Sequence, residues 1–442
     1  KGAAMEPLEN MRLGGGRDWP AGVAPMPPPA AAPAPTPAPT SAPAPSTVAI
    51  GANLYGMQAA EFGLRYGSGS LPNVHFTVPR KSDVAWLAAN GFTRNRLPIQ
   101  WELLQPMLHD TPANATARAL IGEPGAFHAA YESYITGVLD AHAAVGTKCI
   151  IDLHNYCRYR DFIFQADGSV IGLEKQQNPL IYAYTTNSSQ VQTRIFALAP
   201  GATLKQSNFV DFWTRAANKW KSHPGFGGYG LMNEPFWLPA PGTNVEVRDG
   251  SEDLTIWPAY AQAAINAIRA IDPVNPIYLG GNEWSAAMSL ATKNPSWPLQ
   301  GANIIYEVHM YLDAGSSGQR FDYDSEVALG YNAGFGPGAI NLDTGVERLK
   351  LAVEWAKPRG LKLALTETGM PIDDPRWDGG DDGRRFDFGG GLCGRSGIVA
   401  RRTGSEYDGQ GAHDHEQMGS DHDSGQQRGR CARSRSKRSC AG

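Results

Sequence analysis

Two glutamates occupy positions from which they could share acid–base chemistry. Glu234 lies in the segment LMNEP and Glu367 in the segment LTETG, and each ends a short apolar run of β type. One carboxylic acid can protonate a departing glycosidic oxygen while a second carboxylate attacks the anomeric carbon, which requires the two groups to lie about 5 Å apart. This pair therefore favours hydrolysis of a glycosidic bond.

Three further polar segments also follow runs of β type. They are NRLP, which contains Arg96, DLHNY, which contains His154, and VHMY, which contains His309 and Tyr311. Enzymes built on α/β barrels keep their active sites at the carboxyl ends of the strands. Any one of these short motifs could occur by chance, but the order and placement of all five predict a single site.

The elements that must position these groups alternate along the chain. Short β-type runs are separated by helical segments with apolar residues at three- and four-residue spacing, which favours parallel strands joined by helices. The predicted strands cover residues 48–54, 91–98, 148–153, 227–232, 276–281, 303–309 and 362–366. The predicted helices cover residues 126–144, 209–222, 254–271 and 346–356. This α/β pattern predicts a (β/α)8 TIM barrel whose eighth strand is not recognisable in this chain.

The composition divides the 442 residues into four parts. Residues 1–23 are a short N-terminal segment, and residues 24–46 are a linker rich in Pro, Ala and Thr, which favours an extended spacer. Residues 47–377 form the predicted catalytic barrel. Residues 378–442 are a Gly- and Arg-rich tail, in which 396–400 is the best remaining strand candidate. One interpretation is a disordered tail, and another is an out-of-frame reading of a GC-rich gene.

Charge and apolar runs exclude several classes of partner. The formal net charge is −4, and no basic stripe precedes the extreme C-terminus, so we expect no nucleic-acid partner. No apolar run approaches the roughly 18 residues of a membrane span. We expect a monomer.

The chain opens with Lys rather than Met, so any signal peptide has been removed or was not included. A Cys149–Cys157 disulfide remains an open alternative to two free thiols.

From about Ile50 to Trp377, the chain resembles glycoside hydrolase family 5. The resemblance is carried by RLPIQWELLQP from Arg96, IDLHNYCRY from Ile151 and YEVHMYLD from Tyr306, beside the two glutamate motifs. Within that family the chain looks most like secreted endo-β-1,4-glucanases of the plant-pathogen and fungal cellulase type. The resemblance implies secretion, a β-glucan substrate, and a reaction without cofactor or metal.

The resemblance also assigns roles to individual residues. It implies that Glu234 is the general acid/base and Glu367 the nucleophile. The implied supporting residues are Arg96, His154, Asn233, His309 and Tyr311. The family also places a substrate-stacking Trp after its eighth strand, and this sequence offers no candidate for it.

Each of these roles has a physical reason. Glu234 must hold a proton near neutral pH, so its pKa has to be raised by burial and by the charge of Glu367. Glu367 must stay ionised, and Arg96 with the Tyr311 hydroxyl could supply the stabilising hydrogen bonds. Asn233 could donate to the sugar 2-hydroxyl. The alternative readings are a helix cap for Glu234, a structural ion pair for Arg96 and a core or loop histidine for His154.

Aromatic side chains near the strand ends could stack on pyranose faces. The alternative for each is packing in the core, and Trp237 and Trp284 are the best candidates because each follows a strand end directly. The full set of candidates is Tyr55, Trp101, Tyr156, Trp237, Trp284 and Trp297.

The sequence therefore predicts an endoglucanase that cleaves internal β-1,4-glucosidic bonds of cellulose by a retaining double displacement. One alternative is a related β-glycanase that acts on mannan, xylan or mixed-linkage glucan. Another is a carbohydrate-binding barrel that has lost catalysis. Exo or endo action depends on the long segments 107–125 and 158–208, which could either roof the cleft or leave it open.

Overall fold

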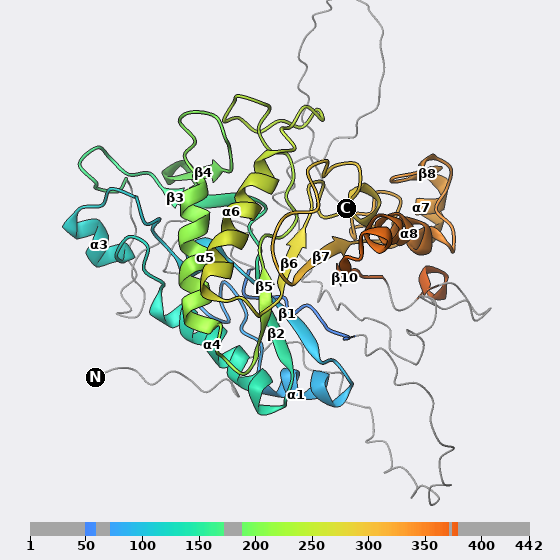
Figure 1. The fold of residues 1–442 in the computed structure, drawn as a ribbon, viewed down its shortest axis with the longest axis horizontal. Coiled ribbons are helices and arrows are strands. Elements are labelled where there is room, and N and C mark those ends of the chain that lie inside the picture. Colours follow the sequence, from blue (N-terminus) through green and yellow to red (C-terminus); the bar gives the residue numbers. More distant parts are fainter. Residues whose placement is uncertain (1–48, 59–70, 172–187, 371–373, 379–442) are drawn as a thin grey trace, which may run out of the picture. The chain divides into compact units, whose positions relative to one another are not determined.

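The computed structural model describes residues 49–58, 71–171, 188–370 and 374–378. Its main feature is a six-stranded parallel sheet with the order β1-β2-β5-β6-β7-β10 (Figure 1). The strands are β1 (Arg94–Ile99), β2 (Lys148–Leu153), β5 (Phe226–Gly230), β6 (Ile277–Gly280), β7 (Ile304–His309) and β10 (Lys362–Glu367). Neighbouring strands follow one another in the chain, as parallel pairs with crossover connections require. Six of the seven predicted strands are thereby confirmed.

The strand predicted at residues 48–54 is not a regular strand in the described part of the chain. Residues 50–54 run beside β1 and form an isolated parallel bridge between Asn53 and Arg96. The Ile50 carbonyl accepts from the amides of Thr93, just before β1, and of Arg94, its first residue. A Cβ at Gly51 would lie only 1.6 Å from the Arg94 carbonyl oxygen. Only glycine fits at this close approach, and the Ala52 amide donates to the Asn95 side chain rather than to the β1 backbone. The ladder is therefore interrupted, although the segment holds the first barrel position.

The two edges of the sheet meet at its carboxyl end. Asn53 Nδ2 donates to the Thr366 carbonyl on β10 at 2.9 Å, and Arg96 on β1 reaches Glu367 on β10. The sheet is therefore curled, as the predicted barrel requires. Among the described residues β10 pairs with β7 alone, and the strand candidate 396–400, the linker and residues 379–442 lie outside them.

Helices connect the strands, and α5 and α6 pack side by side against the sheet (Figure 1). The four predicted helices are confirmed: their N-terminal ends shift by two or three residues, and of their C-terminal ends the one of α5 shifts, by two. The α-helices are α1 (Lys81–Ala89), α2 (Trp101–Leu104), α3 (Ala115–Ile121), α4 (Ala129–Ala144), α5 (Gln206–Trp220), α6 (Ile256–Ile271), α7 (Tyr323–Ala328) and α8 (Thr344–Ala356). The 3-10 helices are η3 (Ser188–Gln190), η4 (Ala287–Ser289), η5 (Lys357–Arg359) and η6 (Pro375–Asp378).

The core is rich in aromatic side chains, and two of the predicted sugar-stacking residues belong to it. Trp101 is fully buried and packs edge-on against Tyr159. Trp297 is also buried and lies against Tyr306. Burial against other rings leaves neither indole available to a sugar, so the core-packing alternative holds for these two candidates.

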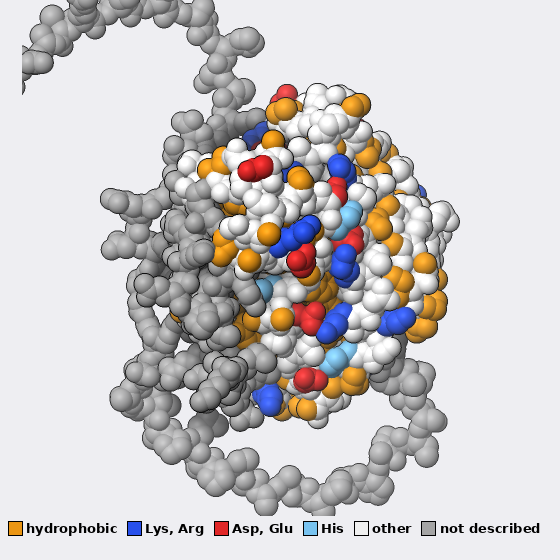
Figure 2. All heavy atoms as spheres, turned by 90° about the vertical axis from the view of Figure 1, so that its left-hand side faces the viewer, with side chains coloured by type: hydrophobic (Ala, Val, Ile, Leu, Met, Phe, Trp, Pro, Cys, Tyr) orange, Lys and Arg blue, Asp and Glu red, His pale blue; other side chains and the backbone are white. Residues whose placement is uncertain are grey.

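Two small antiparallel strand pairs lie outside the main sheet. The pair β3 (Arg158–Phe162) and β4 (Val191–Ile195) lies within the long segment 158–208. The pair β8 (Tyr331–Asn332) and β9 (Gly336–Pro337) follows α7. On the face of the molecule shown in Figure 2, acidic and basic side chains are interspersed.

Cys149 and Cys157 are both buried free thiols. The disulfide alternative is therefore excluded by the structure. Burial raises the pKa of each thiol, with a small opposing effect of Arg158 at Cys157. None of the helices in the described ranges combines the length and apolarity needed to cross a membrane.

Candidate active site

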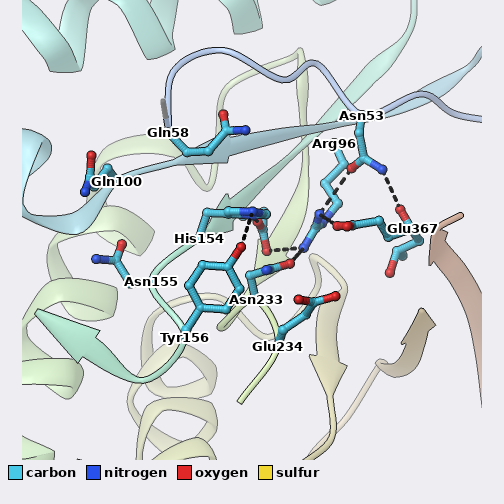
Figure 3. Close-up of polar contacts among 12 residues, drawn as sticks. Asn53, Gln58, Arg96, Gln100, His154, Asn155, Tyr156, Asn233, Glu234 and Glu367 are labelled. Atoms are coloured by element: carbon cyan, nitrogen blue, oxygen red, sulfur yellow. Dashed lines mark hydrogen bonds and ion pairs between the residues drawn. The ribbon is translucent and has the colours of Figure 1, made fainter. Parts of the chain in front are cut away.

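Arg96 lies at the centre of the polar groups gathered at the carboxyl end of the sheet (Figure 3). Its guanidinium contacts Asp152 Oδ1 at 2.8 Å and Glu367 Oε2 at 3.1 Å. It also donates to Asn233 Oδ1 at 2.6 Å and Asn53 Oδ1 at 3.2 Å. Burial alone would lower the Arg96 pKa, but nearby carboxylates raise it. Arg96 thus remains a fixed positive charge that ties four segments together.

Glu367, the last residue of β10, is held in its ionised form. Tyr311 donates its hydroxyl to Glu367 Oε1 at 2.5 Å, and Arg96 donates to the other oxygen. Burial favours the neutral acid, but the positive charges of His309 and Arg96 and the Tyr311 hydroxyl outweigh it. Together they lower the pKa of Glu367 to about 2. This carboxylate is therefore charged throughout the neutral and mildly acidic range.

Glu234 has the opposite electrostatic setting. Burial raises its pKa, the charge of Glu367 raises it further, and a bond to His309 opposes the shift. His309 ends β7, and its Nδ1 lies 2.7 Å from Glu234 Oε1 and 3.8 Å from Glu367 Oε2. Burial would lower the pKa of His309, but the two glutamates raise it. One glutamate is thus suited to carry a proton and the other to remain an anion.

Glu234, His309 and Glu367 lie close enough to act on the same small group. Each presents a ligand-type atom, and these atoms lie within 4.8 Å of one another. That spacing could also hold a metal ion. However, Arg96 already contacts Glu367, and its positive charge opposes a cation at the same carboxylate.

Asn233 and His154 complete the set predicted from the sequence. The Asn233 carboxamide accepts from Arg96, while its Nδ2 is buried with no hydrogen-bond partner among the described residues. His154 follows β2, and its Nδ1 lies 2.9 Å from Asp152 Oδ2 while its Nε2 lies 3.2 Å from the Tyr156 hydroxyl. A buried amide donor without a partner is costly, so Asn233 is positioned to bind an incoming acceptor.

Trp237 and Trp284 lie beside the site and contact each other, with ring centroids 5.4 Å apart. Trp284 stacks on Phe236 at 4.9 Å, and the Arg248 guanidinium lies 4.2 Å from the Trp237 centroid. One face of each indole is occupied by the protein, which leaves only the opposite face for a sugar. Phe236 meets Tyr156 edge-on at 5.5 Å and so links these rings to His154.

The backbone at the strand ends departs from ordinary conformations. Glu234, Trp237 and Trp284 have φ angles of 42°, 44° and 54°. Such angles cost about 1–3 kcal/mol each and concentrate at functional sites. Their occurrence directly after β5 and β6 supports this edge of the sheet as the site.

Sequence reasoning gave no role to Asp152, Glu307 or Asn53, although all three belong to the site. Asp152 bonds both Arg96 and His154. Glu307 is fully buried, and its pKa is raised by burial and by Asp152 and lowered by Arg96. Both acids could have been recognised from the sequence, since Asp152 lies two residues before His154 and Glu307 two residues before His309. Alternate residues of a strand share a face, so each acid should lie on the same side as its histidine. Asn53 carried no comparable signal.

Comparison with protein-family models gives a match over residues 56–379. The matching model is that of cellulase, glycosyl hydrolase family 5. The matched region spans every strand of the parallel sheet and every residue of the site except Asn53.

Individual relatives agree with the family model. The chain is 25% identical over 299 residues to manganese dependent endoglucanase Eg5A of Phanerodontia chrysosporium, which covers 66% of this chain and 57% of that protein. It is 24% identical to probable endo-beta-1,4-glucanase B of Neosartorya fischeri, over 71% of this chain and 72% of the relative. The solved structure of Pseudomonas stutzeri endoglucanase Cel5A in complex with cellobiose is 25% identical, with a TM-score of 0.51 over 76% of this chain and 78% of that one.

Proposed function

This chain belongs to the cellulase family, glycosyl hydrolase family 5, and from that premise we propose that it is an endoglucanase. It hydrolyses internal β-1,4-glucosidic bonds of cellulose and retains the anomeric configuration. The observation that carries this proposal is the pair of glutamates with opposite pKa directions and oxygen atoms within 4.8 Å. Retaining glycosidases hold their two carboxyl groups about 5–5.5 Å apart.

In the first step Glu367 attacks the anomeric carbon, and Glu234 donates its proton to the departing glycosidic oxygen. The C–O bond to the leaving sugar breaks as the bond to Glu367 forms. Consumption of the Glu367 charge removes one cause of the raised Glu234 pKa, so Glu234 stays deprotonated after it has given up its proton and is available as the general base in the next step.

In the second step Glu234 takes a proton from water, and the oxygen attacks the anomeric carbon of the glycosyl-enzyme. Glu367 leaves as the carboxylate, stabilised by Arg96 and the Tyr311 hydroxyl. Asn233 donates its unpartnered Nδ2 to the sugar 2-hydroxyl, a contact that strengthens in the oxocarbenium-like transition state. His309 orients Glu234 through its Nδ1.

The substrate and setting follow from the same premise. The chain spans 57% of the length of the Phanerodontia relative and 72% of the Neosartorya relative, both of which are named as endoglucanases. We propose a β-1,4-glucan substrate, stacking by Trp237 and Trp284, secretion, and a monomeric enzyme.

The Phanerodontia relative is named manganese dependent. Among the residues that the structure describes, the groups that could hold an ion are Glu234, His309 and Glu367, which all have other roles here, so we propose a reaction without metal.

The decisive experiment follows viscosity and reducing ends during hydrolysis of soluble carboxymethyl cellulose. The chain is compared with Glu234→Gln and Glu367→Gln, which preserve shape and remove the reactive groups. A rapid fall in viscosity that both substitutions abolish supports endo-acting catalysis. Parallel assays on mannan, xylan and mixed-linkage glucan test the alternative β-glycanases. A folded parent chain that binds β-glucan without turnover would contradict the proposal and support the non-catalytic barrel.

A second experiment identifies the nucleophile. A 2-deoxy-2-fluoro-β-cellobioside with a good leaving group should form a stable glycosyl-enzyme. The fluorine slows both steps, and the good leaving group restores the rate of the first step alone, so the intermediate accumulates. Peptide mass spectrometry should place the added sugar on Glu367. A label on another residue would refute the assignment.

A further inference from the structure

Arg348 is a buried cation on α8 that the reaction does not use directly. Its side chain is fully buried, and it donates to the carbonyls of Tyr311, Asp313 at 2.9 Å and Ala314 at 3.2 Å. It also donates to Asn332 Oδ1 at 3.0 Å. Its described hydrogen-bond acceptors are thus carbonyl and amide oxygens rather than carboxylates. Burying a guanidinium is costly. The hydrogen bonds of Arg348 offset that cost, and they also fix the backbone of one loop.

That loop, residues 311–318, begins with the tyrosine that contacts the nucleophile. Asp313 accepts from the Ser317 and Gly318 amides at 3.0 and 2.8 Å, and the Ser316 hydroxyl accepts from the Tyr311 amide at 3.2 Å. Gly318 has a φ of 65°, and a Cβ there would lie 2.5 Å from the Tyr311 ring. The loop therefore closes tightly around the Tyr311 side chain.

The three carbonyls that face Arg348 would repel one another without a cation between them. Arg348 can satisfy them together because its guanidinium offers several donors in a rigid plane. The first of these carbonyls belongs to Tyr311, so the position of Arg348 fixes the start of the side chain whose hydroxyl lies 2.5 Å from Glu367.

We propose that Arg348 is a positioning residue that holds the Tyr311 hydroxyl against Glu367 and so adds to the stabilisation of the charged form of the nucleophile. The inference rests on the proposed role of Glu367 as the nucleophile. It assigns to a helix on the outside of the barrel a specific effect on one hydrogen bond at the centre of the site. Arg348 acts through the loop and touches neither the substrate nor the reacting atoms.

The test measures the pKa of Glu367 by NMR with 13C-labelled glutamate, which needs no turnover. The variants are Arg348→Lys, Tyr311→Phe and the double variant, with Leu349→Ala as the control. Lysine keeps the positive charge but cannot reproduce the planar set of donors, so it separates geometry from charge. Leu349 is buried on the same helix, and its truncation weakens packing without removing a donor to the loop.

We expect Tyr311→Phe to raise the Glu367 pKa by about 1–2 pH units and Arg348→Lys to raise it by part of that amount. The double variant should match Tyr311→Phe, because both changes remove the same hydrogen bond. Leu349→Ala should lower the melting temperature and leave the pKa unchanged. Asn332→Ala releases only one of the anchors of Arg348 and serves as a milder variant if Arg348→Lys does not fold.

Two results would overturn the inference. In the first, Arg348→Lys, or Asn332→Ala in its place, lowers the melting temperature but leaves the Glu367 pKa unchanged, as a purely structural residue would. In the second, the shifts of Arg348→Lys and Tyr311→Phe add in the double variant. If the parent chain is folded but inactive on β-glucan, the proposed function fails, and the titration still decides the role of Arg348.

Discussion

Replacement of Tyr311 by Phe removes a single hydroxyl from the site. That hydroxyl donates to Glu367 Oε1 at 2.5 Å, and the phenyl ring can keep its place against Gly318. The substitution therefore deletes one charge-assisted hydrogen bond and leaves Arg96 on the other carboxylate oxygen. Hydrogen bonds to an ionised acceptor are roughly twice as strong as those between two neutral groups.

The expected magnitude follows from that bond. A hydrogen bond to a charged group contributes about 1.5–3 kcal/mol, which equals about 1–2 pKa units. The pKa of Glu367 should therefore rise from about 2 to about 3–4. At pH 3 the parent should keep roughly nine-tenths of Glu367 ionised, and a variant with a pKa near 3.5 roughly a quarter.

The assay is the pH dependence of kcat/KM from pH 2 to pH 6, with circular dichroism at each pH as the control for folding. The acid limb should move upward in pH by about 1–2 units. A soluble aryl cellobioside with a good leaving group serves as substrate, because its departure needs little help from Glu234. An acid limb that stays in place while the protein remains folded would refute the assigned role of this bond.

The same bond affects stability in a predictable direction. The folded-state pKa of Glu367 lies below its ordinary value of 4.5, so this group stabilises the protein above that pH. The contribution is lost as the pH falls through about 2. Tyr311→Phe should therefore cost about 1.5–3 kcal/mol at neutral pH, and this difference should shrink as the pH falls below 4.5 and Glu367 takes up its proton. Urea unfolding at pH 7 and pH 3 would measure the two values.

Further predictions concern the acid/base, the coupling of the glutamates, the thiols and metal. Glu234→Gln should lower kcat on carboxymethyl cellulose by about 10²–10⁴-fold and affect an aryl cellobioside with a good leaving group far less in the first step; equal losses on both would contradict the assignment. Glu367→Gln should lower the Glu234 pKa, because it removes one of the causes that raise it, and NMR titration of labelled glutamate measures this. Cys149 and Cys157 should resist a thiol reagent until the protein unfolds, since burial raises both pKa values; rapid labelling of the native protein would count against it. Dialysis against EDTA should leave kcat unchanged, and added Mn²⁺ should not raise it above the undialysed value.

The positions that sequence reasoning located best are those fixed by strand periodicity. Glu234, His309 and Glu367 follow or end apolar strands, and parallel strands bring their carboxyl ends to one edge. Once the strands are recognised, the local sequence therefore suffices to predict that these three side chains lie close together. Asp152 and Glu307 could have been found by the same two-residue periodicity, but an acid inside a buried strand was not weighed as a partner for Arg96.

Other features depend on tertiary contacts that leave little local trace. Residues 50–54 read as a strand, yet the Ala52 amide donates to the Asn95 side chain instead of the β1 backbone, which interrupts the ladder. Trp101 and Trp284 both follow strand ends, but one is enclosed by the core and the other lies at the site. Arg348 sits in an ordinary helical segment, and only the fold brings the loop carbonyls of residues 311–314 to it.

The position of the nucleophile on β10 has a consequence for the durability of the enzyme. Among the described residues this strand has a single backbone ladder, to β7, and the side chains of Asn53 and Arg96 link it to the opposite edge of the sheet. Strands held from one side open locally at a lower free energy than those held from both. The nucleophile thus lies where side chains, among the described residues, join the two edges of the sheet, and turnover should be lost at a lower temperature than ellipticity where that junction opens first.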